Sequence, residues 1–97
     1  MIAQWIAQTW TAARKMFYRA RGYYAGTLNG LPFRLDPYHS KFWRKAAGGT
    51  WEPETFAVLD THLDQDHDYL DIGAWIGPTV LYGAARARRV YCFEPDP

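Results

Sequence analysis

YLDIGAWIGPTVLYGAARARRVYCFEPDP, residues 69–97, is the stretch that decides the fold, because it reads without gaps as strand, glycine loop, helix and strand. Two short apolar runs, at 69–72 and 90–93, are typical of buried parallel strands. Between them Gly77 precedes Pro78, whose fixed φ suits the first position of a helix. The sequence therefore predicts one βαβ unit, in which a helix connects two parallel strands.

A glycine inside the predicted helix indicates how closely this helix packs on the two strands. Gly83 stands where alanine would favour the helix by about 1 kcal/mol. We therefore expect the helix to lie so close to the strands at Gly83 that a larger side chain would not fit.

Acids and glycines gather at the carboxyl ends of the two predicted strands. Asp71 lies at the end of the first strand, residues 73–77 form the following loop, and Glu94 follows the second strand. Ligands of open parallel sheets bind at this edge. A carboxylate there accepts hydrogen bonds from ribose hydroxyls or from an ammonium group, while Gly73 and Gly77 let a ligand approach the backbone. We therefore predict a ligand site at this edge.

Two cofactor classes suit such a site, a dinucleotide such as NAD and S-adenosylmethionine. A dinucleotide-binding loop has the spacing G-x-G-x-x-G, whereas this loop has only Gly73 and Gly77, with Trp75 between them. Asp71 would repel a pyrophosphate and attract the ammonium group of a methionine moiety. We favour S-adenosylmethionine over a dinucleotide. A structural βαβ unit with incidental acids is the third interpretation.

The segments DIGAWIGPTVLYGAARARRVYCFEPDP and WEPETFAVLDTHL resemble class I S-adenosylmethionine-dependent methyltransferases, in particular the FkbM-type family. The resemblance implies an α/β, Rossmann-like methyltransferase fold and methyl transfer from S-adenosyl-L-methionine to a small-molecule acceptor. It implies that Glu94 holds the ribose hydroxyls. It also implies that Asp71 and Gly73 belong to the loop that lines the methionine part of the cofactor. Ala74, Trp75 and Gly77 of the same loop are further candidate cofactor-binding residues. Trp75 departs from the pattern, since many methyltransferases have glycine at this position.

The length of 97 residues limits what this chain can contain. A doubly wound sheet needs more strands than the sequence supplies, so we expect residues 51–97 to be the first βαβ unit of a truncated cofactor-binding domain. The acceptor pocket and any catalytic base are then expected beyond residue 97. Residues 1–50 are expected to form a helix, a hairpin and a short helix.

The N-terminal part is basic, with eight Lys or Arg and one acid in residues 1–50, against three Arg and nine acids in residues 51–97. It is expected either to bind an anionic partner or to dock on the acidic half. An amphipathic helix opens the chain, with an apolar stripe formed by Ile2, Ile6, Trp10, Ala13 and Phe17. We favour docking of this helix on the domain over contact with a membrane surface. No nucleic-acid partner is expected. The sequence leaves open whether the chain forms a homo-oligomer.

A second functional class is a non-catalytic binding module that this helix attaches to a membrane or to another protein. The remaining elements serve either class. Asn29 and Gly30 predict a hairpin with a type I′ turn, and a short helix is expected at 38–45. A further helix is expected at 51–63, where Glu52 either caps the helix or reaches the cofactor edge of the sheet.

Two other groups of reactive residues receive structural interpretations. The turn DQDHD, residues 64–68, alternates aspartates as a calcium loop does, but Tyr69 stands where that loop needs glycine. We therefore predict a solvated acidic turn and no metal site. Cys92 is the only cysteine and lies in an apolar run, so we expect a buried thiol, no internal disulfide and a reducing, cytoplasmic location.

Overall fold

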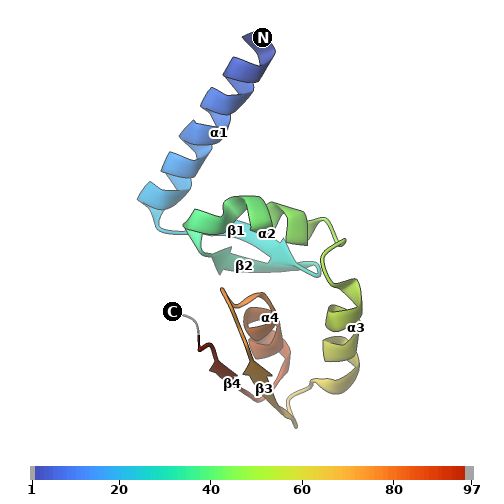
Figure 1. The fold of residues 1–97 in the computed structure, drawn as a ribbon. Coiled ribbons are helices and arrows are strands. Elements are labelled where there is room, and N and C mark those ends of the chain that lie inside the picture. The colour runs from blue at the N-terminus through green and yellow to red at the C-terminus, as the bar shows by residue number, and fades with distance from the viewer. Residues whose placement is uncertain (1, 96–97) are drawn as a thin grey trace.

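The computed structural model describes residues 2–95, so Met1 and the last two residues of the FEPDP motif, Asp96 and Pro97, lie outside the described part. The described residues form a mixed structure of helices and two separate two-stranded sheets. The molecule is elongated, 54 × 26 × 22 Å, and its first helix projects from the body (Figure 1). The elements in chain order are α1 (Ile2–Arg21), β1 (Tyr24–Leu28), β2 (Leu31–Leu35), the 3-10 turn η1 (Pro37–His39), α2 (Ser40–Ala47), α3 (Pro53–His62), β3 (Asp68–Ile72), α4 (Pro78–Arg86) and β4 (Arg89–Phe93).

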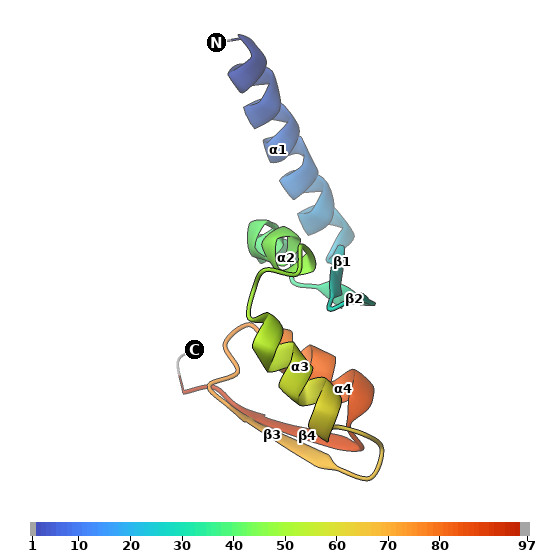
Figure 2. The ribbon, with the colours of Figure 1, turned by 90° about the vertical axis from the view of Figure 1, so that its right-hand side faces the viewer.

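The predicted βαβ unit is confirmed. β3 and β4 are parallel neighbours with Asp71 opposite Cys92, and α4 connects them. The helix begins at Pro78, directly after Gly77, whose φ of 96° is readily adopted only by glycine. α3 and α4 both lie on one face of this sheet (Figure 2). The carboxyl ends of both strands therefore meet at the loop that precedes α4.

The prediction that both strands are buried is wrong, because the described helices cover only one face of the sheet. On the opposite face four apolar residues are exposed, Leu70 at 57%, Ile72 at 76%, Tyr91 at 48% and Phe93 at 58%. We call these four residues the outward sheet face. The sequence also predicts a buried thiol for Cys92, but this residue is exposed. Cys92 lies on β4, which in the described part of the chain pairs with a strand on one side only.

The predicted hairpin is confirmed, and its turn also ties it to the βαβ unit. β1 and β2 pair antiparallel around Asn29 and Gly30, which both have positive φ. The side-chain amide of Asn29 donates to the Tyr82 hydroxyl at 2.8 Å and to the Asp60 carboxylate at 3.1 Å. The Tyr82 hydroxyl in turn donates to Asp60. One turn residue thus connects the hairpin with α3 and α4.

The short helix expected at 38–45 is shifted by two residues, because α2 spans Ser40–Ala47. Asp36 accounts for the shift, since its carboxylate accepts the backbone N–H of Tyr38 at 3.1 Å and starts the turn η1 in front of α2. Trp43 on α2 is fully buried and donates its indole N–H to the backbone carbonyl of Asp36 at 3.0 Å. Trp43 is therefore both a core residue and a link between α2 and the end of β2.

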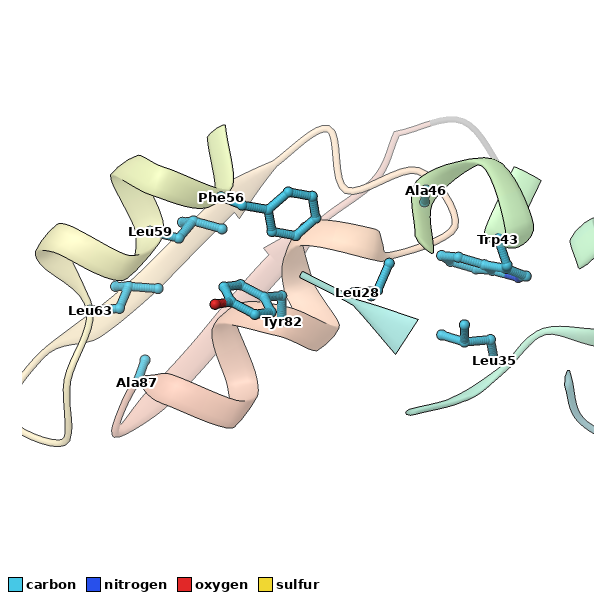
Figure 3. Packing of buried hydrophobic residues seen from close by; sticks show 9 residues of the cluster. All are labelled: Leu28, Leu35, Trp43, Ala46, Phe56, Leu59, Leu63, Tyr82 and Ala87. Atoms are coloured by element: carbon cyan, nitrogen blue, oxygen red, sulfur yellow. The ribbon is translucent and has the colours of Figure 1, made fainter. Parts of the chain in front are cut away.

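The N-terminal part and the βαβ unit share one hydrophobic core. Figure 3 shows the buried side chains of this cluster forming one row that runs from Leu63 and Ala87 in the second part to Trp43 and Leu35 in the N-terminal part. They are Leu28, Leu35, Trp43 and Ala46 from the N-terminal part, and Phe56, Leu59, Leu63, Tyr82 and Ala87 from the second part. The basic half therefore packs on the acidic half, but through apolar side chains, and among residues 2–95 no ion pair joins the two halves. Each ion pair of residues 2–95 joins residues of the same half: Asp36 with His39, Asp60 with Arg86, Asp64 with His67, and Asp68 with Arg88.

The prediction that the N-terminal helix docks on the domain is wrong. α1 has no buried residue, and its large apolar side chains are exposed, from 44% for Ile6 to 76% for Ile2. Its last turns contact the body, where the ring of Tyr18 packs edge-on against Tyr24 at a centroid distance of 4.9 Å. An apolar stripe indicates that a helix needs a partner, but it does not say which partner. None of the helices described here is both long and apolar enough to cross a membrane.

Close packing at Gly83 is confirmed, because a Cβ at this position would lie 2.6 Å from the ring of Tyr69 on β3. We expect Gly83→Ala to destabilise the fold by up to about 2 kcal/mol, since a steric cost of about 1–3 kcal/mol outweighs the gain of roughly 1 kcal/mol in helix propensity. Urea unfolding followed by circular dichroism at low micromolar concentration measures this. Ala84→Gly, on the exposed side of α4, is the control for propensity alone. Unchanged or increased stability of Gly83→Ala would contradict the packing.

Candidate functional site

The loop between β3 and α4 is held against the end of β4 by its own backbone N–H groups. Those of Gly73 and Ala74 both donate to the carbonyl of Phe93, at 2.7 and 3.2 Å. The next one, of Trp75, donates to the carboxylate of Glu94. The structure therefore brings the predicted loop and the predicted ribose-binding acid together at the carboxyl ends of both strands.

Asp71 lies on the face of the sheet that α4 covers, and only 9% of the residue is exposed. Its Oδ2 atom accepts hydrogen bonds from the Tyr69 hydroxyl at 3.0 Å and from the Thr79 hydroxyl in the first turn of α4. Burial raises the pKa of the Tyr69 hydroxyl, which keeps this group protonated as a donor. Asp71 thus places a carboxylate at the start of α4, where the helix dipole favours negative charge.

The exposed indole of Trp75 lies beside aromatic residues of the N-terminal part. The ring of Phe42 on α2 packs edge-on against Trp75 at a centroid distance of 4.8 Å, and it also packs against Trp51 at 5.1 Å. The ring of His39 lies 6.3 Å from Trp75. We call His39, Phe42 and Trp51 the aromatic wall. The aromatic wall therefore comes from α2 and the segments on either side of it, which are distant in sequence from the loop at residues 73–77.

The loop contains three left-handed backbone conformations, at Gly73 with φ 83°, Trp75 with φ 52° and Gly77 with φ 96°. Glycine adopts these angles without steric cost, whereas a tryptophan there costs about 1–2 kcal/mol. Such strain persists only where neighbouring contacts enforce it, and it is concentrated at ligand-binding sites. The Glu94 carboxylate and the aromatic wall supply those contacts, so the loop is a candidate binding element.

Glu52 lies apart from the strand ends, at the start of α3. It is exposed, and its φ of 45° is also left-handed. Its side chain makes no capping hydrogen bond, so the capping role considered from the sequence is not observed. Because Glu52 follows Trp51 directly, it adjoins the aromatic wall. A contact with a cofactor at the loop stays a prediction for this residue.

The sequence reasoning missed the partners of Asp71 and the aromatic wall. Tyr69 could have been identified as a partner of Asp71 from the sequence, because the two-residue period of a strand places both side chains on the same face. Thr79 could also have been identified, since it follows the predicted first helical position, Pro78, and so lies near the strand end where Asp71 stands. Phe42 had no such sequence signal, because no local pattern shows that its packing partner is Trp75.

The turn between α3 and β3 is the solvated acidic turn that the sequence predicts. Asp64 accepts the backbone N–H of Asp66 at 2.8 Å, and its Oδ1 lies 2.6 Å from Nδ1 of His67. Both side chains of this pair are about 60% exposed. Within residues 2–95, no group of three or more His, Cys, Asp or Glu side chains is placed to hold a metal ion.

The Asp64–His67 pair predicts a pH dependence. The hydrogen bond that His67 donates to the Asp64 carboxylate raises the pKa of His67 above its ordinary 6.5, and the same bond lowers the pKa of Asp64. A raised histidine pKa stabilises the fold at pH values below 6.5, and the effect is lost as the pH rises through the folded value. For Asp64 the sign is opposite, and stabilisation is lost as the pH falls through its lowered pKa.

We therefore expect the NMR titration midpoint of His67 to lie above 6.5 in the folded chain and to fall in Asp64→Asn. Asp66→Asn is the matched control, because Asp66 acts on His67 by charge alone and its effect is the smaller one. An Asp66→Asn variant that lowers the midpoint as much as Asp64→Asn would contradict the hydrogen-bonded pair.

No family model, no curated protein and no solved structure matches this chain. The functional assignment therefore rests on the site itself. Its parts are a carboxylate at the end of β4, a tightly held glycine loop, and a buried carboxylate at the start of α4.

Proposed function

We propose that this chain contains the cofactor-binding βαβ unit of an S-adenosylmethionine-dependent methyltransferase of the FkbM type, with a Rossmann-like fold. The observation that carries the proposal is the position of Glu94, whose carboxylate lies beside the loop where two parallel strands end. Ligands of open parallel sheets bind at this edge. A carboxylate accepts several hydrogen bonds at once, so the bond from Trp75 is compatible with bonds from ribose hydroxyls.

The hydrogen bonds of the loop favour this cofactor over a dinucleotide. A pyrophosphate binds to unpaired N–H groups at the start of a helix. Four N–H groups of this loop donate within the protein instead, those of Gly73, Ala74, Trp75 and Gly77. The first helical residue, Pro78, has no N–H group to offer. A pyrophosphate would therefore find few donors.

The charge at the loop points in the same direction. Asp71 places a carboxylate at the start of α4, through its hydrogen bond with Thr79. A pyrophosphate in this position would be repelled by that negative charge, whereas the ammonium and sulfonium groups of S-adenosylmethionine would be attracted. The dinucleotide interpretation consequently stays the weaker alternative.

The residues of this chain would bind and orient the cofactor, which when bound supplies a methyl group on a positively charged sulfur. Glu94 would hold the ribose, and the loop from Gly73 to Gly77 would line the methionine part. Asp71 would fix the start of α4 and favour the cationic end of the ligand. The aromatic wall would hold the ring of Trp75 in place beside the ligand. Such transfer depends mainly on alignment with the acceptor, here proposed to be a small molecule.

The cofactor class is tested by isothermal titration of the chain with S-adenosylhomocysteine, S-adenosylmethionine and NAD. We expect binding of both adenosyl ligands and none of NAD, for the reasons of charge and hydrogen bonding given above. Glu94→Gln is expected to weaken adenosyl-ligand binding by about 1–3 kcal/mol, since a charge-assisted hydrogen bond is lost.

The matched control is Glu54→Gln, which makes the same change at an exposed acid in the first turn of α3. It should bind like the unchanged chain. If the chain binds NAD and neither adenosyl ligand, the dinucleotide becomes the favoured cofactor. If Glu94→Gln leaves the affinity for the adenosyl ligands unchanged, Glu94 does not contact the cofactor.

A further inference from the structure

α1 presents a broad apolar surface that nothing in the described structure covers. Its members are all exposed: Ile2 at 76%, Trp5 at 68%, Ile6 at 44%, Trp10 at 65%, Met16 at 70% and Phe17 at 58%. At about 100° per residue, Trp5 and Trp10 lie about 140° apart around the helix axis and border this surface on its two sides. Tryptophan favours the boundary between apolar and polar surroundings, because its ring is apolar and its N–H is polar.

The helix touches the body with its other side. Tyr18 packs against Tyr24, and the Arg19 guanidinium lies 4.8 Å from the ring centroid of Tyr38. By the same helical geometry Tyr18 lies about 160° around the axis from Ile2, so the apolar surface points away from the domain. Figure 1 shows α1 projecting from the rest of the molecule. The packing of the domain therefore leaves the apolar surface accessible.

The charges of α1 are all of one sign. The helix contains Arg14, Lys15, Arg19 and Arg21 and no acidic residue. These cations lie outside the apolar surface, as a helix at a lipid interface requires. The first acid in the chain is Asp36, which is engaged with Tyr38 and His39. The charge on this helix therefore complements an anionic partner.

We infer that α1 binds in the plane of an anionic lipid surface, with its apolar side in the acyl–headgroup boundary and its cations toward lipid phosphates. A second copy of α1 is the less favoured partner of the apolar surface. Two paired copies would bring like charges together without any acid on α1 to pair with them, whereas helical pairs normally use opposite charges beside the seam. The inference does not depend on the cofactor proposed above.

The test is sedimentation of the 97-residue chain with vesicles of phosphatidylcholine alone and with vesicles containing roughly one third phosphatidylglycerol. We expect binding to the anionic vesicles, a blue shift of tryptophan fluorescence, and weakening by salt. The double change Arg14→Glu and Lys15→Glu should reduce binding at least about tenfold, because each cation near an anionic surface adds to the attraction and each introduced acid opposes it. Trp5→Ala with Trp10→Ala should also reduce it at least about tenfold. Neither pair is buried, so the fold should persist.

Two controls separate α1 from the rest of the molecule. Lys41→Glu with Arg44→Glu makes the same charge change at exposed sites of α2 and should reduce binding far less. Ile72→Thr with Phe93→Thr removes apolar surface from the outward sheet face and should leave binding in place. The inference is overturned by absence of binding to either vesicle at low salt, or by equal losses in the α1 and α2 charge variants. Lipid-independent dimerisation that Trp5→Ala with Trp10→Ala abolishes, without vesicle binding, would identify a second copy as the occupant.

Discussion

Replacement of Trp43 by alanine is expected to destabilise the folded chain by about 3–5 kcal/mol, because a large side chain leaves a cavity in the core. Trp43 is fully buried, and its indole N–H donates to the backbone carbonyl of Asp36, which would lose this partner. A small domain has a total stability on the order of 5–15 kcal/mol, so this single change removes a large share of it.

The measurement is urea unfolding at a low micromolar concentration where the unchanged chain is monomeric by light scattering. Circular dichroism is the suitable signal, because the substitution alters tryptophan fluorescence directly. Trp10→Ala is the matched control, since Trp10 is 65% exposed on α1 and its loss should change stability by less than about 0.5 kcal/mol. Equal effects of the two substitutions would contradict the core described here.

The outward sheet face is expected to make the 97-residue chain self-associate as its concentration rises. Four large apolar side chains lie side by side there, and two parallel strands leave backbone groups unpaired on both outer edges of the described sheet. Each large apolar side chain contributes about 1.5–3 kcal/mol when buried. Ile72→Thr with Phe93→Thr should therefore raise the dissociation constant at least about a hundredfold, while threonine keeps the preference for a strand.

Size-exclusion chromatography with light scattering over a range of concentrations measures this effect. The control is Val58→Thr, because Val58 is as exposed as Leu70, at 57%, but lies on α3 and not on the outward sheet face. Its association should match that of the unchanged chain. A chain that stays monomeric at high micromolar concentration and unfolds in one cooperative urea transition would show that the exposed face is harmless.

Local sequence patterns were sufficient to place most elements. The apolar runs of β3 and β4, the Gly77-Pro78 start of α4 and the Asn29-Gly30 turn all appear in the structure as predicted. Such signals work because backbone preferences and side-chain periodicity act over a few neighbouring residues. The close packing of α4 on the strands at Gly83 also followed, since a glycine inside a helix needs a compensating close contact, but the contacting residue, Tyr69, did not.

Local sequence patterns predicted only part of the candidate site. The order of the elements placed Asp71, the loop and Glu94 at one sheet edge, because parallel strands end on the same side. The sequence did not show that Asp71 is bonded to Tyr69 and Thr79, or that Trp75 meets Phe42. These contacts depend on rotamers and on the packing of α2 beside the loop.

What the sequence by itself determined is therefore the order and type of the elements and the edge of the sheet at which the special residues lie. Burial was decided only by the tertiary structure. The apolar stripe of α1 and the apolar run around Cys92 predicted buried surfaces, yet both are exposed. The physical reason is that apolar periodicity shows which side of an element avoids water, while the arrangement of distant segments decides whether anything covers that side.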